Sequence, residues 1–229
     1  MPNLASALVL TFIWAVPFGA ARQAANPQKL SWEEILVVSK VDDQNLISRA
    51  VLKGDSKELV RLIEMLPNEH KFTAVKVGMR TAIDKDNSEI LKLLTQQNAS
   101  KPILFSGLTP LSYAALYGKL KSLSFLAQTT DNTIRDSTGR IALHYAVVGG
   151  PGAIRKLAKS KNLVNSRDKL GATPLHYACK RRLDSVQLLL RLGANPDIRD
   201  VYGKTPRDKL EAGDPDYELI RKALPNGKD

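Results

Sequence analysis

The sequence predicts an all-α fold: a solenoid of helix pairs with short β-turns projecting between its units. Three sets of residues recur every 32 positions after residue 40, and they carry this prediction. The alanine series stands at Ala50, Ala82, Ala114, Ala146 and Ala178. The leucine series is Leu62, Leu94, Leu126, Ala158 and Leu190, and the glycine series is Gly107, Gly139, Gly171 and Gly203. A fixed period of this length is typical of stacked helical repeats, each burying its apolar face against the next.

The residues between the alanine and leucine series have helical spacing. Three groups show it: Leu59, Leu62 and Ile63; Ile90, Leu91 and Leu94; and Leu120, Leu123 and Leu126. Apolar residues three and four positions apart lie on one face of a helix. Alanine suits an inner helix that packs closely against its neighbours, and leucine suits the core side of an outer helix. Each unit is therefore expected to be an inner and an outer helix.

Turn residues mark where the inner helices begin. Thr109-Pro110, Thr173-Pro174 and Thr205-Pro206 each place a hydroxyl at an N-cap position and proline at the first helical position. Upstream, the segments 136–139, 168–171 and 200–203 have Asp first and Gly fourth, which favours a type I turn. These turns are expected to project between units, and the glycine-rich segment 149–152 to form a loose turn between two helices.

These motifs resemble the ankyrin repeat. Gly171-Ala-Thr-Pro-Leu-His-Tyr-Ala178 is similar to its G-x-T-P-L-H-x-A signature, and the units that start at Gly139 and Gly107 are similar too, although Ile141-Ala142 replaces Thr-Pro. The resemblance covers residues 44–224 as six units and weakens around Ala50, around Ala82 and after Arg207. It implies inner helices and turn tips that line a concave groove. It also implies a protein that binds other proteins and is not an enzyme.

The N-terminus predicts export. Residues 4–18 carry no charge, and Gly19 and Ala21 are small residues at the −3 and −1 positions of a signal peptidase site. We therefore expect a signal peptide over 1–21, cleavage after Ala21, a secreted or periplasmic chain and no membrane span after cleavage. The absence of Lys or Arg before Leu4 argues against this, and the alternatives are an uncleaved membrane anchor or a buried helix. Residues 22–43 would form a lead-in segment and 225–229 a tail.

Composition narrows the chemistry. A single cysteine, Cys179, excludes an intrachain disulfide, and the three histidines have no familiar zinc spacing with it. The sequence contains no Gly-rich phosphate-binding loop. No cofactor, metal site or catalytic residue is therefore predicted, and Cys179 is expected to be a small buried side chain.

Two further sets of residues repeat at 32 positions. His144 and His176 are expected to make hydrogen bonds within turns and between repeats rather than to bind a metal. The tyrosine series is Tyr113, Tyr145 and Tyr177. It is expected to pack between inner helices, and the alternative is a stacking platform for nucleic-acid bases.

Charge is the most informative functional feature. The chain has 34 basic and 23 acidic residues, a formal net charge of +11, and residues 135–209 hold 16 basic and 6 acidic residues. Arg135, Arg167 and Arg199 recur directly before each turn aspartate, and Lys180-Arg181-Arg182 follows an inner helix, where the helix dipole favours cations. The predicted partner-binding residues are Arg135, Arg140, Arg167, Lys169, Arg199, Tyr202, Lys204, Lys180, Arg181 and Arg182.

Two functions follow from this charge. The first is an exported, monomeric module that binds a protein partner with an acidic surface, because opposite charge raises association rates. The alternative is a binder of polyanions, whether nucleic acid, an anionic membrane surface or an acidic glycan, through residues 135–209. The sequon Asn98-Ala-Ser100 would be glycosylated only in a eukaryotic secretory pathway.

Overall fold

The computed structural model describes residues 40–97, 102–180, 182–210, 213 and 216–224. The predicted signal peptide, the Asn98 sequon and Arg181 lie outside these residues. The chain divides into two units, Met1–Asp42 and Asp43–Asp229. The second unit holds the described helices, apart from the first residues of the first helix.

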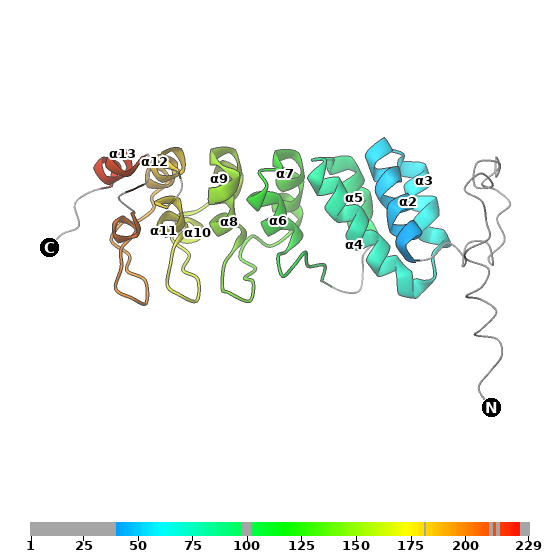
Figure 1. The fold of residues 1–229 in the computed structure, drawn as a ribbon, viewed down its shortest axis with the longest axis horizontal. Coiled ribbons are helices and arrows are strands. Elements are labelled where there is room, and N and C mark those ends of the chain that lie inside the picture. Colours follow the sequence, from blue (N-terminus) through cyan, green and yellow to red (C-terminus); the bar gives the residue numbers. More distant parts are fainter. Residues whose placement is uncertain (1–39, 98–101, 181, 211–212, 214–215, 225–229) are drawn as a thin grey trace, which may run out of the picture. The chain divides into compact units, whose positions relative to one another are not determined.

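The helices form successive pairs (Figure 1). The pairs are α2 (Lys40–Lys53) with α3 (Ser56–Met65), α4 (Asn68–Asp84) with α5 (Ser88–Gln96), α6 (Pro110–Leu116) with α7 (Leu120–Thr129), α8 (Ala142–Gly149) with α9 (Pro151–Leu157), and α11 (Pro174–Ala178) with α12 (Leu183–Arg191). A short helix, α10 (Lys161–Val164), lies between the last two pairs, and the 3₁₀ turn η2 (Arg207–Lys209) and α13 (Tyr217–Ala223) follow them. The described residues contain no strand, which confirms the all-α prediction.

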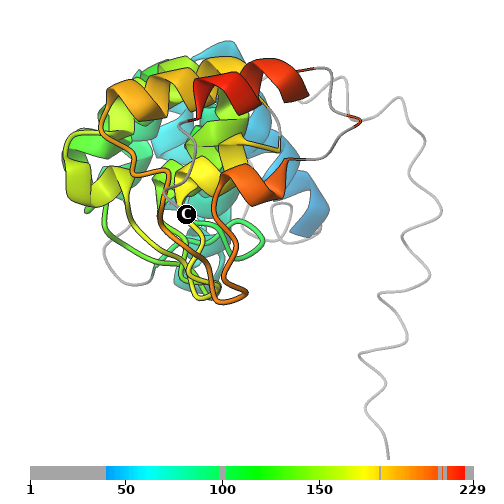
Figure 2. The same ribbon diagram turned by 90° about the vertical axis from the view of Figure 1, so that its left-hand side faces the viewer.

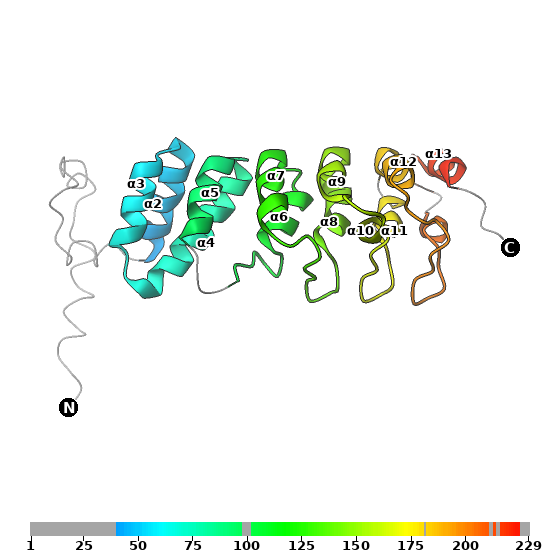
Figure 3. The same ribbon diagram turned by 180° about the vertical axis from the view of Figure 1, so that it is seen from behind.

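From α4 onward, inner helices pack on inner helices and outer helices on outer helices. α6 contacts α8 and α8 contacts α11, while α7 contacts α9 and α9 contacts α12 (Figure 3). The alanine series lies at these inner contacts: Ala50 is 5% exposed, and Ala82, Ala114, Ala146 and Ala178 are completely buried. A larger side chain there would hold neighbouring helices apart, so the alanine series sets the spacing of the stack.

The leucine series is buried only in the middle of the array. Leu94 and Leu126 are buried, whereas Leu62, Ala158 and Leu190 are only partly covered by the core. Next to each of those three residues a neighbour takes the buried place, at Ile63, Leu157 and Leu189. The outer helices therefore turn slightly different faces inward, and a single 32-residue register does not describe all of them.

The turns confirm the role expected for the glycine series. Gly107, Gly139, Gly171 and Gly203 have φ values of +86°, +80°, +70° and +71°. Only glycine adopts this left-handed backbone without strain. The turns that end at the last three of these glycines project from the array on the side away from the outer helices (Figures 1 and 2).

The starts of the inner helices vary from unit to unit. The Thr109 hydroxyl accepts a hydrogen bond from the Ser112 N–H at 3.1 Å, as predicted for an N-cap. In the last unit the Thr205 N–H and hydroxyl both donate to the Asp208 carboxylate at 2.8 Å, and only the 3₁₀ turn η2 follows. This unit therefore departs from the repeat after Pro206, where the sequence also diverges.

Two histidines connect neighbouring units. His144 Nδ1 accepts from the Ile141 N–H at 3.2 Å, and Nε2 faces the Ala172 carbonyl at 3.3 Å. His176 repeats the arrangement with the Thr173 N–H at 3.1 Å and the Lys204 carbonyl at 3.1 Å. Because Nδ1 is the acceptor, we assign the proton to Nε2, which donates to the carbonyl. The expected structural role of these histidines is confirmed.

The segment 149–152 was expected to be a loose turn, and this expectation is wrong. α8 ends at Gly149 and α9 begins at Pro151, so Gly150 alone joins them, with φ +98°. Gly149 lies directly on the preceding unit, where a Cβ would come within 1.9 Å of the Ala115 carbonyl oxygen. These glycines permit close backbone contact between units rather than freedom of movement. Within the described residues, no helix has the length and apolar character needed to cross a membrane.

Gly149→Ala is expected to destabilise the chain, although alanine normally stabilises a helix relative to glycine. The added Cβ would collide with backbone, which cannot swing away as a side chain does, and overpacking of this kind costs about 1–3 kcal/mol. Urea denaturation of the full chain measures the effect. Gly213→Ala is the control, because no heavy atom lies within 4 Å of its added Cβ. Equal free energies of unfolding for the two variants would contradict the close contact.

The histidines predict a loss of stability in mild acid. Burial lowers the pKa of both His144 and His176 below 6.5, so the unfolded chain binds protons more readily than the folded chain. Their contribution to stability is complete above about pH 6.5 and decreases as the pH falls below it. The free energy of unfolding should therefore fall as the pH decreases. His176→Gln should reduce the slope of this fall by at most about 1.4 kcal/mol per pH unit.

Urea unfolding between pH 8 and pH 5 measures the slope. His70→Gln is the control, because His70 lies on α4, next to Glu69, away from the contacts between turns. The histidine bridges would be refuted if wild type and His176→Gln had parallel stability curves.

Candidate protein-binding surface on the turns

Each of the three projecting turns is held by an aspartate. The Asp168 carboxylate accepts hydrogen bonds from the Leu170 and Ala172 N–H groups, both at 2.9 Å, and the Gly171 N–H closes the turn on the Asp168 carbonyl at 2.9 Å. Asp136 and Asp200 make the equivalent bonds in their turns. The turn geometry is therefore fixed by the carboxylate, and the residues between Asp and Gly point outward.

Arg135 and Arg167 connect successive turns. Arg135 Nη1 donates to the carbonyl of Gly139 in its own turn at 2.6 Å and to the Arg167 carbonyl at 2.7 Å. Arg167 repeats this, from Nε to Gly171 at 3.2 Å and from Nη2 to the Arg199 carbonyl at 2.8 Å. We call these bonds the arginine ladder. The two side chains remain exposed, but their guanidinium groups already donate hydrogen bonds to backbone carbonyls. Two of the arginines that the sequence predicts to bind a partner therefore also hold the turns together.

Arg140 belongs to a second network between units. Its guanidinium lies over the Tyr177 ring at 4.6 Å, and Nε donates to the Tyr177 hydroxyl at 3.1 Å. The Tyr177 hydroxyl donates to Asp168 at 2.6 Å, and the Tyr145 hydroxyl donates to Asp136 in the same way. Burial, with the bond to Asp168, raises the pKa of Tyr177 to about 12. The tyrosines therefore pack against the core of the inner helices, as expected. The hydroxyls of Tyr145 and Tyr177 hold the turns, whereas the Tyr113 hydroxyl donates to Asp84 of α4 at 2.8 Å.

The last unit makes this contact with a different residue. Position 209, which is 32 residues after Tyr177, is Lys209, and its ammonium pairs with the Asp200 carboxylate at 2.5 Å. Burial alone would raise the pKa of Asp200, but Lys209 and the N–H groups of Lys204 and Tyr202 overcome this and lower it to about 2. The turn is thus anchored by an ion pair where the preceding turns use a tyrosine hydroxyl.

The tips of the turns expose apolar side chains. We define the turn tips as residues 137–138, 169–170 and 201–202, the two positions between Asp and Gly. Leu170, Val201 and Tyr202 are 46%, 60% and 69% exposed. Lys169 and Lys204 are exposed beside them. Sequence reasoning selected Tyr202 but missed Leu170 and Val201, although a large apolar residue between the Asp and Gly of a projecting turn is a usable signal.

The structure brings together only part of the predicted set. Arg135, Lys169, Arg199, Tyr202 and Lys204 lie on the turns, whereas Arg140 is half-buried at their base. Lys180 and Arg182 follow α11, and Arg182 pairs with Asp184 at 2.7 Å. The basic residues of 135–209 are also divided between two sides of the array, since Arg155 and Lys156 lie on α9 among the outer helices (Figure 2).

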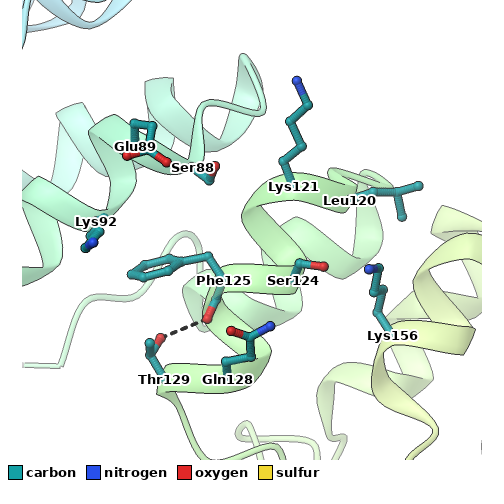
Figure 4. Close-up of a pocket in the computed structure, with 10 residues that line it drawn as sticks. All are labelled: Ser88, Glu89, Lys92, Leu120, Lys121, Ser124, Phe125, Gln128, Thr129 and Lys156. Carbon is teal, nitrogen blue, oxygen red and sulfur yellow. Dashed lines mark hydrogen bonds between the residues drawn. The ribbon is translucent and has the colours of Figure 1, made fainter.

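An open cleft of about 760 Å³ lies on the outer helices (Figure 4). Ser88, Glu89 and Lys92 of α5 line one side, six residues of α7 line the floor, and Lys156 of α9 completes it. Figure 4 shows the Phe125 ring directed towards α5. Glu89 is the one carboxylate among the described lining residues, which include no histidine or cysteine. This arrangement supplies no acid–base pair for catalysis.

The described residues offer little other chemistry. They contain no group of three or more His, Cys, Asp or Glu side chains that could hold a metal ion. Cys179 is completely buried, and burial raises the pKa of its thiol to about 12, so it remains protonated at neutral pH. Cys179 is therefore the small buried side chain that the sequence predicts.

Comparison with known proteins agrees with this architecture. The family model for ankyrin repeats, in three copies, matches residues 79–168 and 128–200. Human protein phosphatase 1 regulatory subunit 27 is 37% identical over 85 residues, 36% of this chain and 53% of the relative. Mouse ankyrin repeat and SOCS box protein 16 is 36% identical over 114 residues, 45% and 25% of the two chains. The E3 ubiquitin-protein ligase hecd-1 of Caenorhabditis elegans is 37% identical over 97 residues, 41% and 4%.

The chain spans about half or less of the length of these relatives. Ankyrin repeats generally mediate binding between proteins and are typically non-enzymatic. Since the family model covers more than half of the sequence and the helix pairs and turns agree with it, the chain belongs to the ankyrin repeat family.

Proposed function

We propose that this chain is a non-enzymatic module that binds an acidic surface of a protein partner through its turn tips. The supporting observation is the exposure of Leu170, Val201 and Tyr202 beside Lys169 and Lys204. Exposed apolar side chains with charges at their rim are typical of protein-binding surfaces, and tyrosine is enriched among residues that dominate binding energy.

The proposed contact surface continues from the turns onto the inner helices. The ends of α6 and α8 expose Tyr117 and Val148, which are 56% and 39% exposed, and Lys180 follows α11 in the next unit. These residues lie at the inner-helix ends, so the partner would rest against the inner helices and the turns together. The lysines would raise the association rate, and the apolar groups would set the affinity.

The observations support a polyanion partner less well. A nucleic acid or an acidic glycan needs a continuous basic track that follows its charges. In this chain the basic residues are divided between turns and outer helices, and the arginine ladder engages Arg135 and Arg167. Binding of a polyanion is therefore an outcome to be tested rather than the function we favour.

Charge reversal on the turns should slow binding. In the double variant Lys169→Glu and Lys204→Glu the association rate should fall roughly tenfold at low ionic strength, because the steering charges are inverted. The measurement is surface plasmon resonance of the full chain against the partner recovered with it from its own cells. Reversal of Arg167 or Arg199 is a poorer test. Reversal of Arg167 would also remove its ladder bond to the Arg199 carbonyl, and reversal of Arg199 would remove its bond to the Gly203 carbonyl within its own turn.

The matched control is Arg155→Glu with Lys156→Glu, the same change in charge on the outer helix α9. The proposal predicts that this variant associates with the partner nearly as fast as the wild type. Equal slowing by both double variants would mean that net charge alone acts, and retention of wild-type chain on heparin at about 0.15 M salt would favour the polyanion.

Export forms part of the proposal. It is supported by the uncharged run 4–18 and the small residues Gly19 and Ala21 after it. The chain isolated from its own cells should start at Arg22, as read by N-terminal sequencing and intact mass. A chain that retains residues 4–18 would contradict cleavage, and fractionation with membranes would then identify the segment as an anchor.

A further inference from the structure

Besides the arginine ladder, successive turns are joined by main-chain hydrogen bonds. The Lys169 N–H donates to the Thr138 carbonyl at 3.0 Å, and the Val201 N–H donates to the Leu170 carbonyl at 2.9 Å. Each turn thus offers its neighbour one tip carbonyl as acceptor and one arginine as donor. In return the neighbour supplies a carbonyl and an N–H that are two residues apart, such as those of residues 167 and 169.

The turn 200–203 offers the same two groups. Arg199 occupies the position of Arg135 and Arg167, and its Nη1 donates to its own Gly203 carbonyl at 2.9 Å. Tyr202 occupies the position of Thr138 and Leu170. Among the residues that the structure describes, none takes the place of a next turn: Arg199 reaches no second carbonyl, and the Tyr202 carbonyl accepts no hydrogen bond.

The side chains around these groups are also the most exposed large apolar ones at the turns. Val201 is 60% exposed and Tyr202 is 69% exposed, and Lys204 is exposed next to them. The helices of the last unit are covered differently, since α13 packs on α12 and buries Ile220. In the described part of the last unit, α13 therefore covers the helices, whereas no further turn pairs with the turn 200–203.

We propose that this open turn accepts a reverse turn of the partner protein, which continues the series of turns by backbone pairing. The partner's turn would donate an N–H to the Tyr202 carbonyl and present a carbonyl to the Arg199 guanidinium, as each turn of the chain does for its neighbour. Acidic side chains on the incoming turn would face Lys204 and the remaining guanidinium N–H groups. This inference rests on the proposed function and specifies the kind of segment that the surface recognises.

A cyclic peptide with the sequence of residues 166–173 tests the inference directly, because the full chain already binds this turn within its own array. In the peptide, Arg167→Glu and Lys169→Glu supply the acidic side chains. Added to isotope-labelled full chain, it should shift the amide NMR signals of residues 199–204 and bind with a dissociation constant in the millimolar range. Shifts confined to the outer helices, or no shifts at about 5 mM peptide, would overturn the inference.

Two matched controls separate backbone pairing from charge attraction. A peptide methylated on the backbone nitrogen of residue 169 keeps every side chain but lacks the N–H that pairs, and it should bind at least tenfold more weakly. The chain variant Arg199→Gln should weaken binding of the parent peptide, whereas Arg155→Gln on α9 should not. Equal affinity of the methylated and parent peptides overturns the inference. If the full partner still depends on Lys169 and Lys204 in that case, the proposed function survives without it.

Discussion

The carboxylate at the start of each projecting turn is the interaction on which the other contacts of this edge depend. It accepts hydrogen bonds from two backbone N–H groups, which fixes the turn. Its second oxygen accepts a hydrogen bond from a tyrosine hydroxyl of the inner helix or, in the last unit, pairs with the Lys209 ammonium of η2. The position of each turn relative to the helical segment that follows it is thereby fixed. Only because successive turns are held alike can the carbonyls of one lie within reach of the arginine of another.

Much of this arrangement could be predicted from the sequence, because the responsible residues repeat. The 32-residue period predicted the helix pairs, and the Asp and Gly positions predicted the turns. Both depend on local sequence preferences that recur at a fixed interval. The arginine ladder could not be predicted, because its acceptors are main-chain carbonyls that every residue possesses. Close contact at Gly149 was missed for a related reason: a glycine that admits a neighbouring backbone and a glycine that loosens a turn look identical in a sequence.

The candidate surface shows how far formal charge can mislead. Counting residues 135–209 suggests a strongly basic face, yet Arg140 is half-buried over a tyrosine ring, Lys209 neutralises Asp200, and Arg182 pairs with Asp184. The turn arginines keep their charge but are held by backbone carbonyls, whereas Lys169 and Lys204 stand beside the apolar side chains of the tips. Such a surface discriminates by shape and contact as well as by sign, which agrees better with a folded partner than with a flexible polyanion.

The hydrogen bonds that join the described turns run through main-chain groups and through arginines outside the tips, so these bonds do not depend on the side chains at positions 137–138, 169–170 and 201–202. Substitution of these side chains, in evolution or by design, can therefore leave the bonds between turns intact. Binding specificity and fold stability are therefore determined by different groups of this molecule. Closely related chains can differ in the partner they bind while they keep the same backbone.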